Sequence, residues 1–241
     1  MSRAEGALHH RTALACEAAS AAGVPGRFRV WDEAGLRAVL ATDPALDFLP
    51  MVSGVTRETL PAVAGFVTGP GWNGVKPTVV VPAELGDPPM AGFARTGDRL
   101  LAVKRLAPRP AADAPPDVVD EDTFLRVLLA GFEAHGAVAA FMAAEHRMTA
   151  MRRFLVVERE TPIAAAGMTI HGDVAVLGAA STLRAHRGRG AQPRLLRRRL
   201  QAAGEAGCTL AVATARPGSA SAANLGRAGF HLHRRSAWTK L

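Results

Sequence analysis

The sequence predicts an α/β protein with a central mixed sheet (α/β or α+β), because helical and strand patterns are interspersed along its 241 residues. Apolar residues make up 49% of the chain, which is enough for a substantial buried core. Four of the ten residues at 107–116 are prolines, and such a stretch cannot form the interior of a helix or strand. We therefore predict a first domain at 1–106, a linker at 107–117 and a second domain at 118–241.

Local signals predict the elements of the first half. Thr56 is a suitable helix N-cap, and the β-branched run at 77–81 is typical of a strand. The triplet Thr-Gly-Asp at 96–98 favours a turn, which predicts a hairpin. The expected elements are helices at 7–22, 33–41 and 57–68, strands at 28–31, 46–55 and 77–81, and a hairpin over 92–106.

The second half has clearer periodicity. Phe124, Val127 and Leu128 recur at helical spacing, and the triplet His-Gly-Asp at 171–173 favours a tight turn between two apolar strands. The expected elements are helices at 121–134, 137–147, 191–206 and a short one ending at 227, and strands at 153–157, 163–170, 174–183, 209–214 and at the end of the chain.

Positive charge is concentrated in one segment. The formal net charge is +8, seven arginines lie between Arg184 and Arg199, and no acidic residue occurs between Val174 and Gly204. Aromatic residues make up only 5% of the chain and tyrosine is absent, which argues against stacking on single-stranded nucleic acid. A small polyphosphate ligand explains the cluster better, although some of these arginines would simply form a solvated helix face.

Several other classes of site are not indicated. No apolar run reaches the ~18–20 residues of a membrane helix, and the N-terminal residues lack a signal-peptide pattern. Cys16 and Cys208 stand far apart in apolar surroundings, which is typical of buried thiols, and no Cys/His spacing suggests a metal site. We expect a cytoplasmic protein with no metal and no membrane partner.

The segment at 181–192 carries most of the functional argument. An apolar run ends there, Gly188-Arg189-Gly190 follows, and a helical pattern begins at Ala191. Strand, glycine loop and helix together direct backbone N–H groups and the positive end of a helix toward an anion. The residues do not form a P-loop, and Pro193 stands where a dinucleotide-binding fingerprint needs its third glycine.

Residues 187–192, Arg-Gly-Arg-Gly-Ala-Gln, resemble the signature Gln/Arg-x-x-Gly-x-Gly/Ala of the GCN5-related N-acetyltransferases (GNAT), with Gln in the last position. The strand at 209–214 and the segment 219–230, ending in Gly-Phe, follow in the family's order. The resemblance covers roughly residues 118–241 and implies a GNAT fold there. The element pattern of the first half, which lacks such a loop, resembles a degenerate copy of the same unit.

The resemblance also implies a site for acetyl-CoA, or another acyl-CoA, as co-substrate. Backbone groups at the strand end would meet the pantetheine arm, the glycine loop would hold the pyrophosphate, and two polar side chains beyond it would contact the cofactor. The alternatives are an ordinary glycine turn, a helix-capping role for Ser219 and a capping or solvated role for Asn224. The implied cofactor-binding residues are Ser181, Thr182, Leu183, Arg187, Gly188, Arg189, Gly190, Ala191, Gln192, Ser219 and Asn224.

The family often uses a tyrosine as acid where this chain has Leu225, so no catalytic residue is assigned. Ser219, Ser221 or water could protonate the leaving thiolate, or the thiolate could leave unassisted. The implied function is N-acyl transfer to a small amine or amino-acid-like acceptor. The alternatives are a non-catalytic acyl-CoA sensor or docking module and, because the surface is basic, an acyltransferase that works with an acidic acyl carrier protein.

Overall fold

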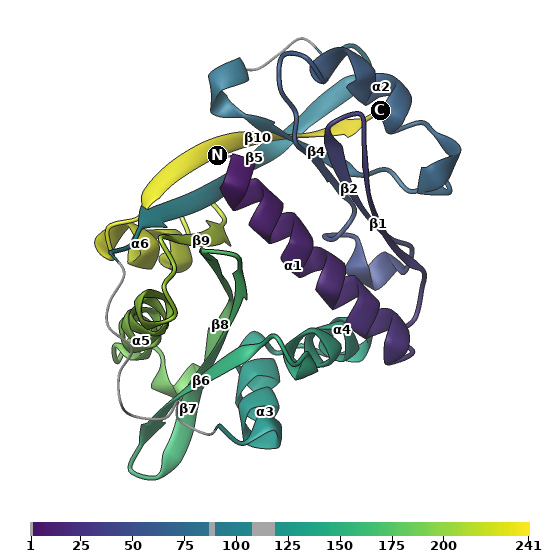
Figure 1. The fold of residues 1–241 in the computed structure, drawn as a ribbon. Coiled ribbons are helices and arrows are strands. Elements are labelled where there is room, and N and C mark those ends of the chain that lie inside the picture. Colours follow the sequence, from purple (N-terminus) through teal and green to yellow (C-terminus); the bar gives the residue numbers. More distant parts are fainter. Residues whose placement is uncertain (1, 87–89, 108–118) are drawn as a thin grey trace.

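The computed structural model describes residues 2–86, 90–107 and 119–241. The described strands form one ten-stranded sheet in the order β1-β2-β3-β4-β10-β5-β9-β8-β7-β6, with parallel pairing in β3–β4 and β8–β9 (Figure 1). The predicted α/β class with a mixed sheet is confirmed. Apart from Ala107, the predicted linker lies outside the described residues, and the division into two domains stays a prediction.

The first half contributes two helices and five strands, joined by short 3-10 turns. Its elements are α1 (Ser2–Ala21), β1 (Phe28–Glu33), β2 (Leu36–Ala41), β3 (Met51–Ser53), α2 (Val63–Phe66), β4 (Thr78–Pro82) and β5 (Phe93–Arg105).

The second half follows the predicted order of elements to within about two residues. Its elements are α3 (Glu121–Phe132), α4 (Gly136–Arg147), β6 (Arg152–Glu158), β7 (Thr161–His171), β8 (Val174–Thr182), α5 (Ala191–Glu205), β9 (Leu210–Ala215), α6 (Ala220–Arg227) and β10 (His231–Lys240).

Two predictions for the first half are wrong. The expected helix at 33–41 is the second strand of a hairpin, because Ala34 and Gly35 both have positive φ and turn the chain back along β1. The expected hairpin over 92–106 is the single strand β5, with a bulge at Thr96. Pairing of β5 with β10 on one side and β9 on the other outweighs the local turn preference.

Two further expectations for the first half are only partly met. The predicted helix at 57–68 contains the short helix α2 and a 3-10 turn. The predicted strand at 46–55 contains only β3. The segments between these elements make the turns that connect β2 to β3 and β3 to β4.

The two halves exchange their last strands at the centre of the sheet. β5 pairs with β9 of the second half, whereas β10 pairs with β4 of the first half, and β5 and β10 pair with each other. Read from either edge, the sheet therefore has two antiparallel pairings, one parallel pairing and then the last strand of the other half.

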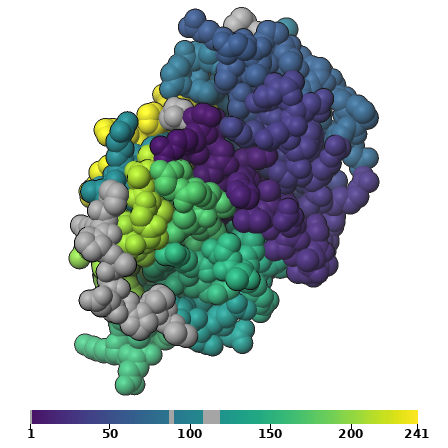
Figure 2. All heavy atoms as spheres, in the orientation of Figure 1, coloured from purple at the N-terminus to yellow at the C-terminus, as the bar shows by residue number. Residues whose placement is uncertain are grey.

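Helices cover both faces of the sheet. Alternation along β7 separates the layers, since Ala165 packs with α3 whereas Ala164 and Ala166 pack with α5. Helix α1 contacts β1 and β2 of the first half and β7, β8 and β9 of the second. In Figure 2 this purple helix lies between the blue first half and the green second half. The N-terminal helix thus forms part of the seam between the halves.

Candidate functional site

The candidate site begins where two parallel strands separate. β8 and β9 pair only from Val174 to Val176 against Leu210 to Val212, and no pairing follows beyond that point. β8 also carries a bulge, because Ala180 pairs with Ala166 and Gly178 pairs with Gly167, which leaves Ala179 without a partner residue on β7. The separation exposes the free edge of β8 to a cavity.

Two buried arginines fix this part of β8. A Cβ on Gly178 would lie 2.1 Å from the Arg11 guanidinium, so only glycine permits this close approach. Arg11 donates to the Val176 carbonyl at 3.3 Å and pairs with Glu145 at 2.7 Å. Arg199 donates to the Gly178 carbonyl at 3.3 Å, and burial lowers its pKa to about 10. The bulge therefore rests on a network drawn from α1, α4 and α5.

The glycine loop has the conformation that an anion cradle needs. Gly188 and Gly190 have φ of +78° and +80°, and a Cβ at either position would meet no atom within 4 Å. The space beside both glycines is therefore open. Gly190 is the N-cap of α5, whose first N–H groups have no partner within the helix. The Arg187 side chain connects the loop to β8 and α3 by donating to the carbonyls of Thr182 and Gly131 at 3.2 and 2.9 Å.

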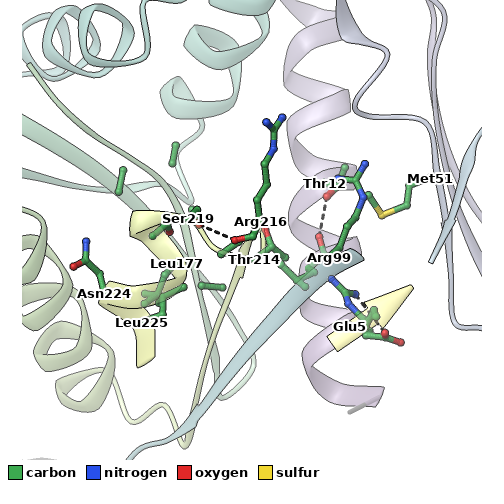
Figure 3. Close-up of a pocket in the computed structure, with 18 of the residues that line it drawn as sticks. Glu5, Thr12, Met51, Arg99, Leu177, Thr214, Arg216, Ser219, Asn224 and Leu225 are labelled. Carbon is green, nitrogen blue, oxygen red and sulfur yellow. Dashed lines mark hydrogen bonds and ion pairs between the residues drawn. The ribbon is translucent and has the colours of Figure 1, made fainter. Parts of the chain in front are cut away.

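A cavity of about 560 Å³ connects the two halves at this point. The second half lines it with β8, β9, α5 and α6, and the first half lines it with α1, β2, β3 and β5. Figure 3 shows Asn224 and Leu225 on one side of this cavity and Glu5 on the opposite side, with Arg216 and Arg99 between them.

The structure brings three of the predicted side chains to the cavity wall: Gln192, Ser219 and Asn224. Gln192 donates to the Thr182 hydroxyl at 3.0 Å. Ser219 caps α6 by accepting from the Ala222 amide at 3.1 Å. The Asn224 carbonyl oxygen accepts from Arg227 at 2.6 Å, which leaves its amide group as a donor.

The other predicted residues do not line the cavity described above. The Ser181 side chain is buried and donates to the Leu128 carbonyl of α3 at 3.0 Å. The Leu183 amide donates to the Ile163 carbonyl at 2.9 Å. Arg189 and Ala191 flank Gly190 at the start of α5. The cofactor-binding role of the whole set stays a prediction.

Leu225 occupies the position at which the resemblance leads one to expect a tyrosine. Its side chain is buried in the core and also lines the cavity. This position therefore has no hydroxyl. The hydroxyls on α6 and its N-cap that line the cavity belong to Ser221 and Ser219. The structure therefore has no side-chain proton donor at position 225.

Sequence reasoning missed the wall that the first half contributes. Glu5 and His9 lie on α1, Arg37 on β2 and Arg99 on β5, and all four line the cavity. No local motif marks them, because their proximity depends on pairing between strands far apart in the sequence. A weak signal exists, since Glu5 and His9 are four residues apart and so share one face of a helix.

His9 is the one histidine that lines this cavity in the described part of the chain, and it contacts Asp32 outside the wall. His9 Nε2 lies 2.9 Å from Asp32 Oδ1, and the His9 side chain is 13% exposed. Burial lowers the pKa of His9 below its usual value, although the Asp32 charge opposes this. The lowered pKa favours the neutral imidazole near pH 7, and the contact with Asp32 favours the tautomer in which Nε2–H donates and Nδ1 carries the lone pair.

Two other kinds of site are absent from the described residues. No group of three or more His, Cys, Asp or Glu side chains could hold a metal ion there. No helix among them is long and apolar enough to span a membrane. Cys16 and Cys208 are both free and buried, as the sequence predicts, and burial raises the pKa of the Cys16 thiol to about 12.

No protein-family model and no curated protein matches this sequence. Solved structures do match, over both halves of the chain. A GCN5-related N-acetyltransferase from Kribbella flavida has a TM-score of 0.63 and 18% identity, covering 92% of this chain and 95% of its own.

Two further structures match this chain over a similar share of its length. A GCN5-related N-acetyltransferase from Sphaerobacter thermophilus has a TM-score of 0.57 and 16% identity over 86% of this chain and 80% of its own. A GNAT-family acetyltransferase from Colwellia psychrerythraea has a TM-score of 0.56 and 14% identity over 90% and 85%. The chain therefore has the fold of GCN5-related N-acetyltransferase structures over nearly its whole length.

Proposed function

We propose that the protein is an acyl-CoA-dependent N-acyltransferase, with acetyl-CoA as the simplest donor, that acts on a small amine. The observation that carries this proposal is the separation of β8 from β9 beside the glycine loop, at one end of a cavity that continues into the first half. The fold shared with acetyltransferases of similar length supports it.

The residues present fit an acyl-CoA. Open space beside Gly188 and Gly190 and the N-terminus of α5 suit a pyrophosphate. The free edge of β8 suits an extended, amide-bearing arm, because strand edges offer paired donors and acceptors. Gln192 and Asn224 offer side-chain amides along the way. When bound, acetyl-CoA supplies an activated acyl group.

The chain's own groups would assist transfer in two ways. Backbone N–H groups at the bulge of β8, held by Arg11 and Arg199, are fixed donors for the oxyanion that develops during attack on a thioester. His9 is neutral and lies in the wall, so its Nδ1 would take the proton from the attacking amine. A thiolate with a pKa of roughly 8.5 can leave without a dedicated acid near neutral pH.

Calorimetry with acetyl-CoA tests the donor site, and release of free thiol from acetyl-CoA across a library of amines tests the reaction. We expect saturable binding and amine-dependent thiol release. Absence of binding at ~1 mM acetyl-CoA, a threshold of about 4 kcal/mol, would contradict the proposal. Binding without thiol release for any amine would favour the sensor or docking function, which the absence of a hydroxyl at Leu225 motivates.

We also propose that the first half is a degenerate copy of the unit in the second half. The strand order, which repeats from either edge of the sheet up to the exchanged strands, supports this. The connection between β3 and β4 in the first half has Gly69-Pro70-Gly71 but no Arg-x-x-Gly-x-Gly loop, so the same calorimetry should give one acetyl-CoA per chain. Two equivalent sites per chain would contradict the degenerate role.

A further inference from the structure

The end of the cavity next to the first half is strongly basic, with arginines from both halves. Arg37 on β2, Arg99 on β5, Arg216 after β9 and Arg235 on β10 line it, and we call these four residues the arginine cluster. Glu5 is the sole acidic residue that lines the cavity in the described part of the chain. Four positive charges therefore face one negative charge.

The carboxylate of Glu5 does not neutralise this cluster. It lies 3.5 Å from Arg235 and 4.0 Å from Arg37. No carboxylate in the described residues pairs with Arg99 or Arg216. Burial, and then the charge of Arg216, lower the pKa of Arg99. The protein thus holds like charges together without enough counter-charge of its own.

One donor of the cluster is also left without a partner. Arg235 is only 4% exposed, and its Nε is buried with no hydrogen-bond acceptor in the described structure. A buried, unpaired donor on a charged group destabilises the folded protein. An anion that enters the cavity would relieve the mutual repulsion of the arginines.

Part of the cluster lies away from the donor end of the cavity, whereas Arg216 lies between the two ends. Figure 3 shows Arg99 and Glu5 away from Asn224, which lies on the α6 side with Leu225. A fifth cavity arginine, Arg199, is not available, because its guanidinium donates to the carbonyls of Leu195, Gly167 and Gly178. An anion at the cluster would therefore lie beyond the reacting end of an acyl donor, where an acceptor must bind.

We propose that the arginine cluster binds an anionic oxygen group, a carboxylate or a phosphate, carried by the acceptor. Guanidinium forks match the geometry of both groups and can bind them through two parallel hydrogen bonds. The acceptor is then an amine that also bears a negative charge, and the cluster selects it against neutral and cationic amines. The acceptor role rests on the proposed acyl transfer, whereas anion binding does not.

Anion binding is measured first, without acetyl-CoA, using inorganic phosphate and acetate as the simplest phosphate and carboxylate. Calorimetry is done on the full-length protein and on Gly190→Val, in which the glycine loop no longer contributes a second anion site. We expect saturable binding of at least one probe in both proteins. Arg99→Gln and Arg216→Gln should each weaken it at least about tenfold.

The matched control is Arg105→Gln, on the same strand as Arg99 but exposed and outside the cavity wall. It should bind the probes as the unsubstituted protein does. Arg216 is also exposed, so its variant can be interpreted even if Arg99→Gln fails to fold. Equal affinities in all three arginine variants, or no saturable binding of either probe, would overturn the proposal.

Glu5→Gln gives an opposite expectation. It removes the one negative charge among the arginines, so phosphate or acetate should bind more tightly and should raise the melting temperature of the variant more than that of the unsubstituted protein. A purely structural role for the cluster predicts lower stability that neither anion restores. That outcome would contradict the proposal.

Thiol release then tests the acceptor class with matched pairs: L-alanine against L-alaninamide, and phosphoethanolamine against ethanolamine. We expect the charged member of at least one pair to have the higher kcat/KM, and the productive pair distinguishes carboxylate from phosphate. Arg99→Gln should remove the preference. Anion binding without turnover of any amine would contradict acyl transfer alone, whereas turnover that ignores charge would contradict this inference alone.

Discussion

The two parallel strand pairs of the sheet share a topology and differ in what joins them. Between β8 and β9 the chain forms the glycine loop and the 15-residue helix α5. Between β3 and β4, which pair through Met51 with Thr78 and Val52 with Val79, it forms 3-10 turns and the four-residue helix α2. One connection leaves open space at a helix N-terminus, and the other does not.

The connection in the first half is filled by its own side chains. Trp72 is 2% exposed, donates to the Phe66 carbonyl at 3.0 Å and has its ring 4.8 Å from that of Trp31. This connection is part of the core, and the first half contributes charged side chains from other elements to the shared cavity. The comparison shows that the shared topology alone does not leave open space at a helix N-terminus; the glycines at 188 and 190 do so, where we propose that a pyrophosphate binds.

The largest effect is expected from breaking the ion pair between Arg11 of α1 and Glu145 of α4, which joins the two halves. Arg11→Met leaves Glu145, whose side chain is only 16% exposed, without its cationic partner. Unpairing a buried charge costs about 3–5 kcal/mol, so the free energy of unfolding should fall by that amount in urea denaturation. The double variant Arg11→Met/Glu145→Leu should recover much of the loss.

The control for that variant is Arg3→Met, also on α1 and also paired across the halves, with Asp173. Both side chains of this pair are about half exposed, so the change should cost no more than about 1 kcal/mol. Similar losses for Arg3 and Arg11 would show that burial does not distinguish the two links.

The next effect compares glycines from the two halves. Gly190→Val should lower acetyl-CoA affinity at least about 100-fold, or about 3 kcal/mol in calorimetry, because the side chain enters the open space of the cradle. Gly74→Val, in the first half, is matched: Gly74 also has φ of +80° and open space around its Cβ position. Equal loss of affinity in the two variants would mean that backbone strain, not the cradle, is responsible.

A pH titration examines another contact between the halves, where the ring of His10 of α1 packs at a tilt against that of His171, with ring centroids 4.8 Å apart. Burial, aided by the charges of His10 and Arg11, lowers the pKa of His171 to about 4. His171 takes up a proton near pH 6.5 in the unfolded chain but only near pH 4 in the folded chain. The free energy of unfolding should therefore fall as the pH drops from 6.5 to 4. The loss is at most about 3 kcal/mol.

His171→Gln can keep a hydrogen bond to the Thr169 hydroxyl and should flatten the dependence of the unfolding free energy between pH 6.5 and 4. An unchanged slope in chemical denaturation at several pH values would show that other groups cause it.

The smallest effect tests whether the first half takes part in chemistry. His9→Gln should lower kcat about 10- to 100-fold, because no other imidazole lines the cavity in the described residues. The unsubstituted protein should lose activity as pH falls through the pKa of His9, below its usual value, and the variant should lack that limb. His10→Gln, one residue along α1, is the control. A variant at His9 with full kcat would leave the first half with a binding role only.

The elements of the second half could be predicted because their signals are local. The apolar runs of β7 and β8, the apolar face of α3 and the glycines before α5 are each signals over a few residues. The same local reasoning failed at 33–41 and 92–106, where the partner strands decide the conformation. A two-residue period identifies a strand but does not say which strand it pairs with.

The candidate site likewise has a part that local sequence signals predict and a part that depends on long-range strand pairing. The sequence by itself determined the glycine loop, the helix that follows it and the departures at Gln192 and Leu225. Only the tertiary structure decided that β5 and β10 change places, which brings Arg235 and Arg99 beside Glu5 at the far end of the cavity. Strand exchange depends on long-range pairing, and no pattern within either half encodes the partner.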